Sequence, residues 1–137
     1  MKKLHLGLVA AFLTAIALLV GCSTLDENER AWIFQPSDRT WSGGALAAQG
    51  MDDVWISFNA KSAGLAEPRP VRLHGLWLAA DKPATSTSPV LLYLHGARYN
   101  VTGSAPRIRR MQALGFSVLA IDYRGFGKST NELPSEA

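Results

Sequence analysis

Two short segments of the sequence hold most of the side chains that could take part in chemistry. One reads Leu-Tyr-Leu-His-Gly-Ala-Arg over residues 92–98, and the other reads Asp-Tyr-Arg-Gly-Phe-Gly-Lys-Ser over 122–129. Histidine, aspartate and serine serve in acid–base and nucleophilic catalysis, and glycine lets a loop turn sharply. No Gly-x-Ser-x-Gly elbow, which would present a serine nucleophile, occurs in the sequence. The two segments therefore hold candidate site residues, without the serine elbow that would complete a catalytic set.

A nucleotide site is an alternative interpretation of the second segment. Gly127-Lys128-Ser129 follows a predicted strand, as the end of a phosphate-binding loop would. Such a loop also needs a glycine five residues before Gly127, and that position is Asp122, whose carboxylate would repel phosphate. We therefore do not predict nucleotide binding, and measurable ATP affinity would reverse this conclusion.

Composition argues against several other classes of function. The chain has one cysteine, Cys22, and three histidines, so a metal site built from these residues is not expected. No cofactor is implied. The net charge of +3 includes Lys2 and Lys3 of the N-terminal leader, and without them only one positive charge is in excess. Nucleic-acid binding needs a clustered basic face, which this balance does not predict.

A strand, a helix and a second strand are expected to position the two segments. Val90–Leu94 is an apolar run without alternation, which is typical of a parallel strand buried on both faces. Ser104 can cap a helix that has Pro106 in its first turn and Gly115 at its end. A second buried strand is predicted over 116–121. Together these elements form a βαβ unit with a right-handed crossover.

Elements on either side of this unit are predicted less sharply. Residues 54–58 and 71–80 are β-prone and indicate two early strands that pair antiparallel. The residues from Pro134 to the end indicate the first turn of another helix.

The order of the two segments on these elements resembles that of the α/β-hydrolase superfamily, particularly bacterial serine-peptidase-like and esterase-like hydrolases. The resemblance covers residues 54–137. It implies an α/β fold, namely the N-terminal half of a mixed, mostly parallel sheet that is truncated before the nucleophile strand. Family topology would place that strand beside residues 90–94. Without it, this edge is open, and we expect the isolated chain to be poorly soluble.

The resemblance also assigns roles to residues. His95, Gly96, Ala97 and Arg98 would form the oxyanion loop, with the Ala97 N–H as donor to the developing negative charge. His95 itself is expected to be a structural residue, because the family places its catalytic base near the C-terminus. The nucleophile, acid and base are all expected after residue 137. A structural loop would be formed by Asp122, Arg124, Gly125 and Gly127.

The implied function is hydrolysis of an ester, thioester or amide through a serine nucleophile in the full-length protein. The resemblance implies a small-molecule or acyl substrate, and the chain alone is expected to be inactive. An alternative is a non-catalytic envelope lipoprotein that uses a hydrolase-like scaffold to bind a partner. The gene sequence past codon 137 distinguishes the two, because only the enzyme needs a nucleophile elbow there.

The N-terminus indicates secretion and lipid attachment. A basic start and an apolar run up to Val20 are typical of a signal peptide over residues 1–21. The sequence then resembles the bacterial lipoprotein signal, in which Cys22 is lipidated and anchors the protein to the membrane. Ser23 favours the outer membrane by the same resemblance, so we expect a lipid-anchored protein of the bacterial cell envelope that faces the periplasm. Residues 22–50 are predicted to be a tether and N-terminal extension, with a short extended segment at 32–34, and 51–137 the partial hydrolase domain.

Overall fold

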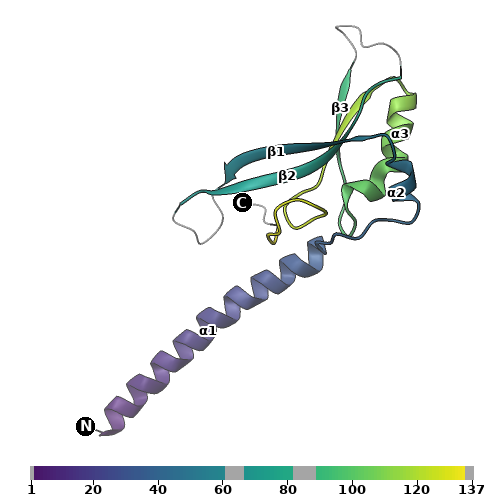
Figure 1. The fold of residues 1–137 in the computed structure, drawn as a ribbon. Coiled ribbons are helices and arrows are strands. Elements are labelled where there is room, and N and C mark those ends of the chain that lie inside the picture. Colours follow the sequence, from purple (N-terminus) through teal and green to yellow (C-terminus); the bar gives the residue numbers. More distant parts are fainter. Residues whose placement is uncertain (1, 61–66, 82–88, 135–137) are drawn as a thin grey trace.

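The computed structural model describes residues 2–60, 67–81 and 89–134 (Figure 1). Most of the helical turn predicted to begin at Pro134 lies outside these residues. The elements in chain order are helix α1 (Lys2–Phe34), helix α2 (Gly44–Ala47), strands β1 (Asp52–Ala60), β2 (Arg69–Leu78) and β3 (Val90–Leu94), the 3₁₀ turn η1 (Val101–Ser104), helix α3 (Ala105–Ala113) and strand β4 (Ser117–Ile121).

The described strands form one mixed sheet in the order β1-β2-β4-β3. The β1–β2 and β2–β4 pairs are antiparallel, with Val54 opposite Gly75 and Gly75 opposite Ile121. The β3–β4 pair is parallel, with Leu92 opposite Leu119, and α3 provides the crossover between these two strands. The predicted α/β fold with a mixed sheet, and the strand–loop–helix–strand order over residues 90–121, are confirmed.

Helix α3 begins and ends where the local sequence signals predicted, but the capping side chain is a different residue. Pro106 lies in the first turn of α3, and Gly115 follows the helix with a φ of 97°, a conformation that glycine adopts without strain. Ser104 precedes α3 as predicted, but its side chain makes no capping hydrogen bond. Asn100 instead caps the preceding turn η1, by accepting the Gly103 N–H over 3.1 Å.

The core lies between the sheet and α3. Its buried apolar side chains come from β2, η1, α3 and β4, and are Leu76, Leu78, Val101, Ile108, Val118 and Ala120. Burial of a large aliphatic side chain contributes about 1.5–3 kcal/mol to folding, so this cluster is the main source of stability in the described domain. It fixes the carboxyl ends of β3 and β4 side by side.

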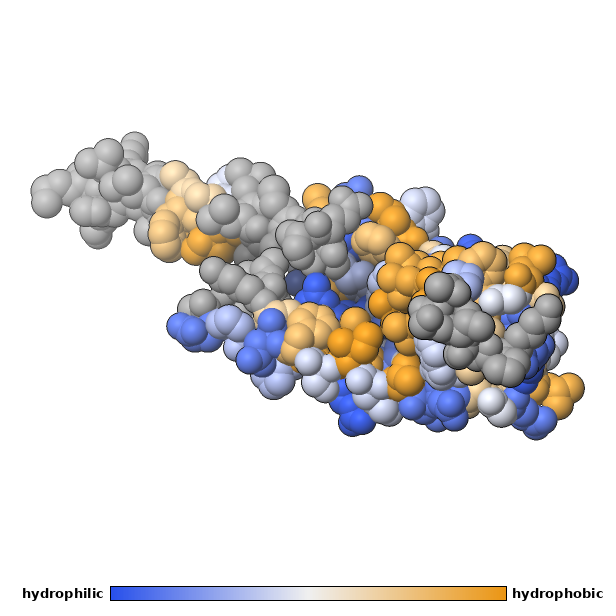
Figure 2. Space-filling model, turned by 90° about the horizontal axis from the view of Figure 1, so that it is seen from above, coloured by the Kyte–Doolittle hydropathy of each residue, from blue (hydrophilic) through white to orange (hydrophobic). Residues whose placement is uncertain are grey.

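The opposite face of the sheet is exposed at β3 within the described chain. Val90, Leu92 and Leu94 of β3 are 63%, 56% and 51% exposed. The prediction that this strand is buried on both faces is therefore wrong for the described residues, because α3 covers only one side. β3 also pairs only with β4 among the described strands, so its other edge is open, as expected. Apolar side chains reach the surface at several places on the face shown in Figure 2.

Helix α1 covers the predicted leader and the first part of the predicted N-terminal extension. It continues past Cys22 to Phe34, so the extended segment predicted at residues 32–34 is helical instead. No glycine or proline interrupts residues 22–35, and Pro36 then disfavours the helical conformation in the residue before it. Gln35 accordingly has a φ of 46°, and its N–H donates to the Ala31 carbonyl over 3.0 Å. Among the helices of the described ranges, none combines the length and the hydropathy that a membrane span requires.

Candidate functional site

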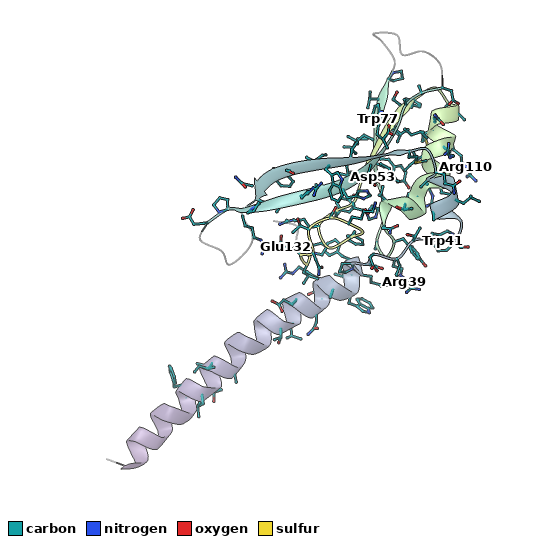
Figure 3. All side chains as sticks on the ribbon, viewed as in Figure 1. Arg39, Trp41, Asp53, Trp77, Arg110 and Glu132 are labelled. Atoms are coloured by element: carbon teal, nitrogen blue, oxygen red, sulfur yellow. The ribbon has the colours of Figure 1, made fainter. Side chains whose placement is uncertain are left out.

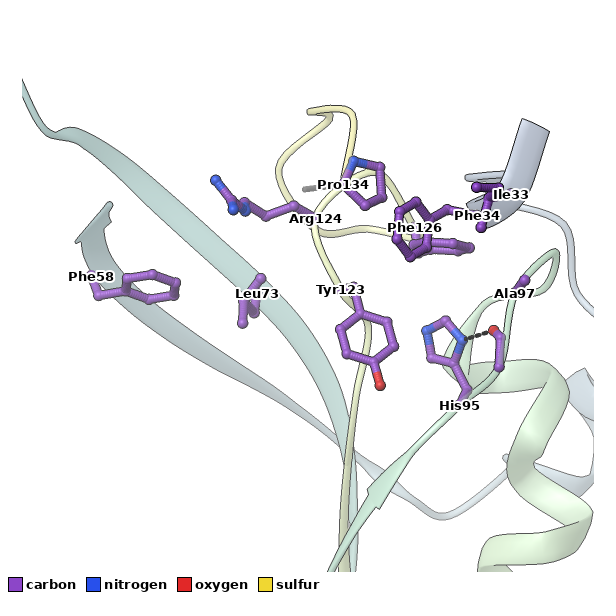
Figure 4. Close-up of a pocket in the computed structure, with 11 residues that line it drawn as sticks. Ile33, Phe34, Phe58, Leu73, His95, Ala97, Tyr123, Arg124, Phe126 and Pro134 are labelled. Atoms are coloured by element: carbon purple, nitrogen blue, oxygen red, sulfur yellow. Dashed lines mark hydrogen bonds between the residues drawn. The ribbon is translucent and has the colours of Figure 1, made fainter. Parts of the chain in front are cut away.

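The predicted oxyanion loop lies at the carboxyl end of β3, beside the loop that follows β4 (Figure 4). A cavity of about 630 Å³ opens between these loops, the sheet and the end of α1. Ligand sites typically have volumes of about 300–1,000 Å³ and mostly apolar walls. The residues that line the cavity are mainly apolar or aromatic: Ile33, Phe34, Phe58, Leu73, His95, Gly96, Ala97, Tyr123, Arg124, Phe126 and Pro134.

His95 is turned into the protein from the start of this loop. Its ring is buried against Tyr123 and Phe126, with ring centres 5.0 and 5.1 Å away. Nδ1 donates to the Gly96 carbonyl over 2.6 Å. Nε2 lies 3.2 Å from the Asp122 carboxylate, within ion-pair distance but outside hydrogen-bond geometry. Both nitrogens are thus directed at protein atoms, which suits a structural histidine better than a catalytic base.

Ala97 carries the backbone amide that the sequence singled out. Gly96 and Ala97 are exposed, and both also line a second cavity of about 340 Å³ on the other side of the loop. Within the described chain, no acceptor receives the Ala97 N–H. A sharp turn is expected at Gly96, but the loop residue with a positive φ is Arg98, at 83°. At Gly96 itself an added Cβ would meet no atom within 4 Å, so this position does not require a glycine for space. The Arg98 N–H donates to the Phe34 carbonyl over 3.4 Å.

Asp122 is the centre of the loop after β4 and is 1% exposed. Its Oδ1 accepts the Val101 N–H over 2.6 Å, and its Oδ2 lies 3.1 Å from Nδ1 of His74. Gly127 has a φ of 52°, and a Cβ there would overlap the Asp122 carboxylate. Asp122 therefore joins β2, β4 and the start of η1, and the glycine leaves room for its carboxylate.

Arg124 and Gly125 shape the rest of this loop. Nη1 of Arg124 donates to Glu132 over 3.1 Å, and Glu132 also pairs with Arg69 of β2. Gly125 has a φ of 79°, and a Cβ there would lie 2.6 Å from the Glu132 carbonyl and 3.1 Å from Pro36. These contacts hold residues 123–134 against β2.

His74 is a central residue that sequence reasoning missed. Its Nδ1 faces Asp122 as described, and its Nε2 lies 2.5 Å from the carboxylate of Asp53 on β1. Because both ring nitrogens face carboxylates, the ring is best described as a charged imidazolium that donates twice. The pairing of β1 with β2 brings Asp53 to His74, and the pairing of β2 with β4 brings Asp122 there, so no local sequence signal could have revealed these contacts.

Electrostatics of the cluster agree with this assignment. Burial opposes the charged form of His74, but the hydrogen bonds that its ring donates to Asp122 and then to Asp53 outweigh burial and raise its pKa above the ordinary value. Burial likewise opposes the Asp122 carboxylate, yet its hydrogen bond with His74 helps to hold its pKa below the ordinary value. The pKa of Asp53 is lowered by its hydrogen bond to His74 and then by Lys128, whose Nζ lies 3.0 Å away.

Ser129 belongs to the same cluster and is buried. Its Oγ accepts the His74 N–H over 2.9 Å and donates to the Asp122 carbonyl over 2.9 Å. With its hydroxyl occupied in this way, Ser129 is a loop residue and not a nucleophile. No group of three or more His, Cys, Asp or Glu side chains in the described ranges could hold a metal ion.

A segment between α1 and α2, residues 35–41, is fastened to both loops and is called the strap below. The Gly127 N–H donates to the Ser37 carbonyl over 3.0 Å. The Asn100 N–H donates to the Arg39 carbonyl over 3.0 Å, and its side chain donates to Asp38 over 2.7 Å. Figure 3 shows Arg39 and Trp41 of the strap beside the domain. Sequence reasoning placed these residues in the N-terminal extension and missed their contribution to the site.

Comparisons with known proteins give structural matches only. No family model and no curated protein matches the chain. A solved structure of a probable hydrolytic enzyme from Pseudomonas aeruginosa PAO1 is similar over 73% of this chain and 30% of its own, with 22% identity and a TM-score of 0.46. An esterase of Pyrococcus furiosus is similar over 71% of this chain and 33% of its own, with 20% identity and a TM-score of 0.41.

The chain spans about a third of the length of these two structures. Its own sheet order, its parallel β3–α3–β4 unit and its loops at the carboxyl ends of β3 and β4 define the fold independently of them. At the level of the fold, the described chain is an α/β unit with a mixed, four-stranded sheet and a parallel β3–α3–β4 crossover.

Proposed function

We propose that the full-length protein is a membrane-anchored serine hydrolase acting on an ester, thioester or amide, to which this chain contributes the oxyanion loop. The observation that carries the proposal is the Ala97 amide, which is exposed beside a largely apolar cavity and has no acceptor among the described residues. A preorganised amide of this kind stabilises the negative charge that develops on a carbonyl oxygen during acyl transfer.

The open edge of β3 supports the same proposal. A nucleophile strand paired there would bring its serine to the carboxyl end of the sheet, on the same side as Ala97. The amide that follows the serine would be the second oxyanion donor. The strand, the serine, the acid and the base are all proposed to follow residue 137.

Removal of the Ala97 amide tests the function. In the full-length protein, Ala97→Pro is expected to lower kcat for p-nitrophenyl acetate by about 10²–10³-fold, because proline has no N–H to donate. Ala97→Gly keeps the amide and is expected to lose far less activity. Covalent labelling of the wild-type protein by a fluorophosphonate serves as the check for a serine nucleophile.

Two results would contradict the proposal. One is equal activity of the proline and glycine variants, provided that circular dichroism shows both to be folded. The other is an open reading frame without a nucleophile elbow after codon 137, which would favour the non-catalytic envelope lipoprotein instead.

Attachment to the bacterial cell envelope through lipidated Cys22 is part of the proposal. The leader, the position of the cysteine and its uniqueness in the chain support it. We expect Cys22→Ala to move the protein out of the membrane fraction, because several acyl chains would be lost and each buried CH₂ contributes about 0.8 kcal/mol. Cell fractionation and immunoblotting measure this, with Ser42→Ala as the control. Unchanged membrane association of the Cys22 variant would disprove the anchor.

A further inference from the structure

Two strained residues of the described chain meet beside the oxyanion loop. Gln35 and Arg98, with φ angles of 46° and 83°, are the non-glycine residues of the described ranges that have positive φ. Nε of Arg98 donates to Oε1 of Gln35 over 2.9 Å. Left-handed backbone is unfavourable for residues with a Cβ, so it persists where neighbouring contacts hold it, and such strain tends to gather at functional sites.

These contacts fix the oxyanion loop on both sides of Ala97. On the amino side, the buried His95 ring bonds to the Gly96 carbonyl. On the carboxyl side, Arg98 is held by the Phe34 carbonyl through its backbone and by Gln35 through its side chain. Ala97 itself makes no such contact within the described chain, so its orientation depends on these two attachment points.

The end of α1 is well placed to provide the second attachment. Phe34 is the last residue of the helix and lines the same cavity as Ala97 (Figure 4). Beyond Gln35, the strap is hydrogen-bonded to Asn100 and Gly127. The position of Gln35 is therefore determined from both directions along the chain.

We propose that Gln35 and Arg98 form a clamp that holds the oxyanion loop in its working conformation, with Gln35 as a positioning residue contributed by the N-terminal segment. This inference rests on the proposed function, because it assigns the clamp to the same loop. The Gln35–Arg98 hydrogen bond is solvent-exposed, so its loss should affect the loop far more than the stability of the domain.

The first test is kinetic and uses the full-length protein. We expect Gln35→Ala to lower kcat for p-nitrophenyl acetate by about 3–10-fold, the effect that losing one exposed hydrogen bond can have on the population of the working loop, with KM changed less than about twofold. Gln35→Glu retains an acceptor for Arg98 and is expected to recover most of the loss. Gln49→Ala is the matched control, because Gln49 is exposed and only its backbone is used in contacts.

A double-mutant cycle separates the clamp from independent effects. Arg98→Gly removes the side chain but permits the positive φ without strain. The Gln35→Ala/Arg98→Gly double variant should lose no more activity than the more impaired single variant, since both changes break the same contact. Full additivity, or a kcat of Gln35→Ala within twofold of wild type, would overturn the proposal.

The second test does not depend on activity. Amide hydrogen exchange followed by mass spectrometry should show faster exchange over residues 96–100 in Gln35→Ala, with no change in α3. Absence of this local acceleration would refute the clamp even in an active enzyme. If exchange accelerates but the wild-type protein neither hydrolyses esters nor reacts with a fluorophosphonate, the clamp stands and the proposed hydrolase function fails.

Discussion

Asp122→Ala is expected to lower the free energy of unfolding by about 3–5 kcal/mol, the loss typical when one partner of a buried ion pair is removed. The Asp122 side chain is 1% exposed, and its carboxylate accepts the Val101 N–H and faces the buried ring of His74. In the variant, a buried amide and a buried charged imidazole both lose an acceptor. Because these groups belong to three different elements, we expect β2, β4 and η1 to loosen together.

Asp53 provides the matched control for this experiment. It pairs with the other nitrogen of the same histidine, but its side chain is 52% exposed. Water can replace its contacts, so Asp53→Ala should cost no more than about 1 kcal/mol. Urea unfolding of both variants in the full-length protein, followed by circular dichroism, measures the difference. Equal losses in the two variants would show that Asp122 is not the centre of the cluster.

Gly127→Ala should destabilise the protein by about 2–4 kcal/mol through two effects. The residue has a φ of 52°, which an alanine adopts only with strain. In addition, the new Cβ would overlap the carboxylate of Asp122 and lie 3.2 Å from Cβ of Asn100. The carboxylate cannot move away without giving up its bonds to His74 and Val101.

Gly50→Ala isolates the first of these effects, the backbone strain. Gly50 also has a positive φ, of 78°, but a Cβ there would meet no atom within 4 Å. Its substitution should therefore cost only the backbone term, about 1 kcal/mol. Thermal unfolding of the two variants is sufficient for the comparison. A similar loss at both positions would mean that the close approach of residue 127 to Asp122 is unimportant.

The parts of the fold that the sequence predicted well depend on neighbours in the chain. The apolar run at Val90–Leu94 and the Pro106 and Gly115 signals around α3 are local features, and the structure places the strand and helix where they indicated. The end of α1 was predicted wrongly at residues 32–34, because their aromatic and β-branched side chains favour strands while the uninterrupted helix before them favours continuation.

The missed parts of the site depend on contacts between distant residues. His74 and Asp53 are brought together by the pairing of β1 with β2, and His74 meets Asp122 because β2 pairs with β4. The strap contacts residues about 60 positions away, such as Asn100, through backbone carbonyls, which carry no residue-specific signal. The exposure of Leu92 could not be predicted either. An apolar run indicates that both faces of a strand can be buried, but it does not show whether another element packs on each face.

Helix α1 continues without interruption from Cys22 to Phe34, just before the strap, so its length sets the distance between Cys22 and the domain. Along a helix, residues 22 and 34 are separated by about 18 Å, at 1.5 Å per residue. With the proposed lipid on Cys22, the cleft beside Phe34 would work within that height of the bilayer surface and could not drift far into the periplasm. Under the same proposal, the helix would serve as a short, stiff stalk that keeps the cavity close to the lipid–water boundary.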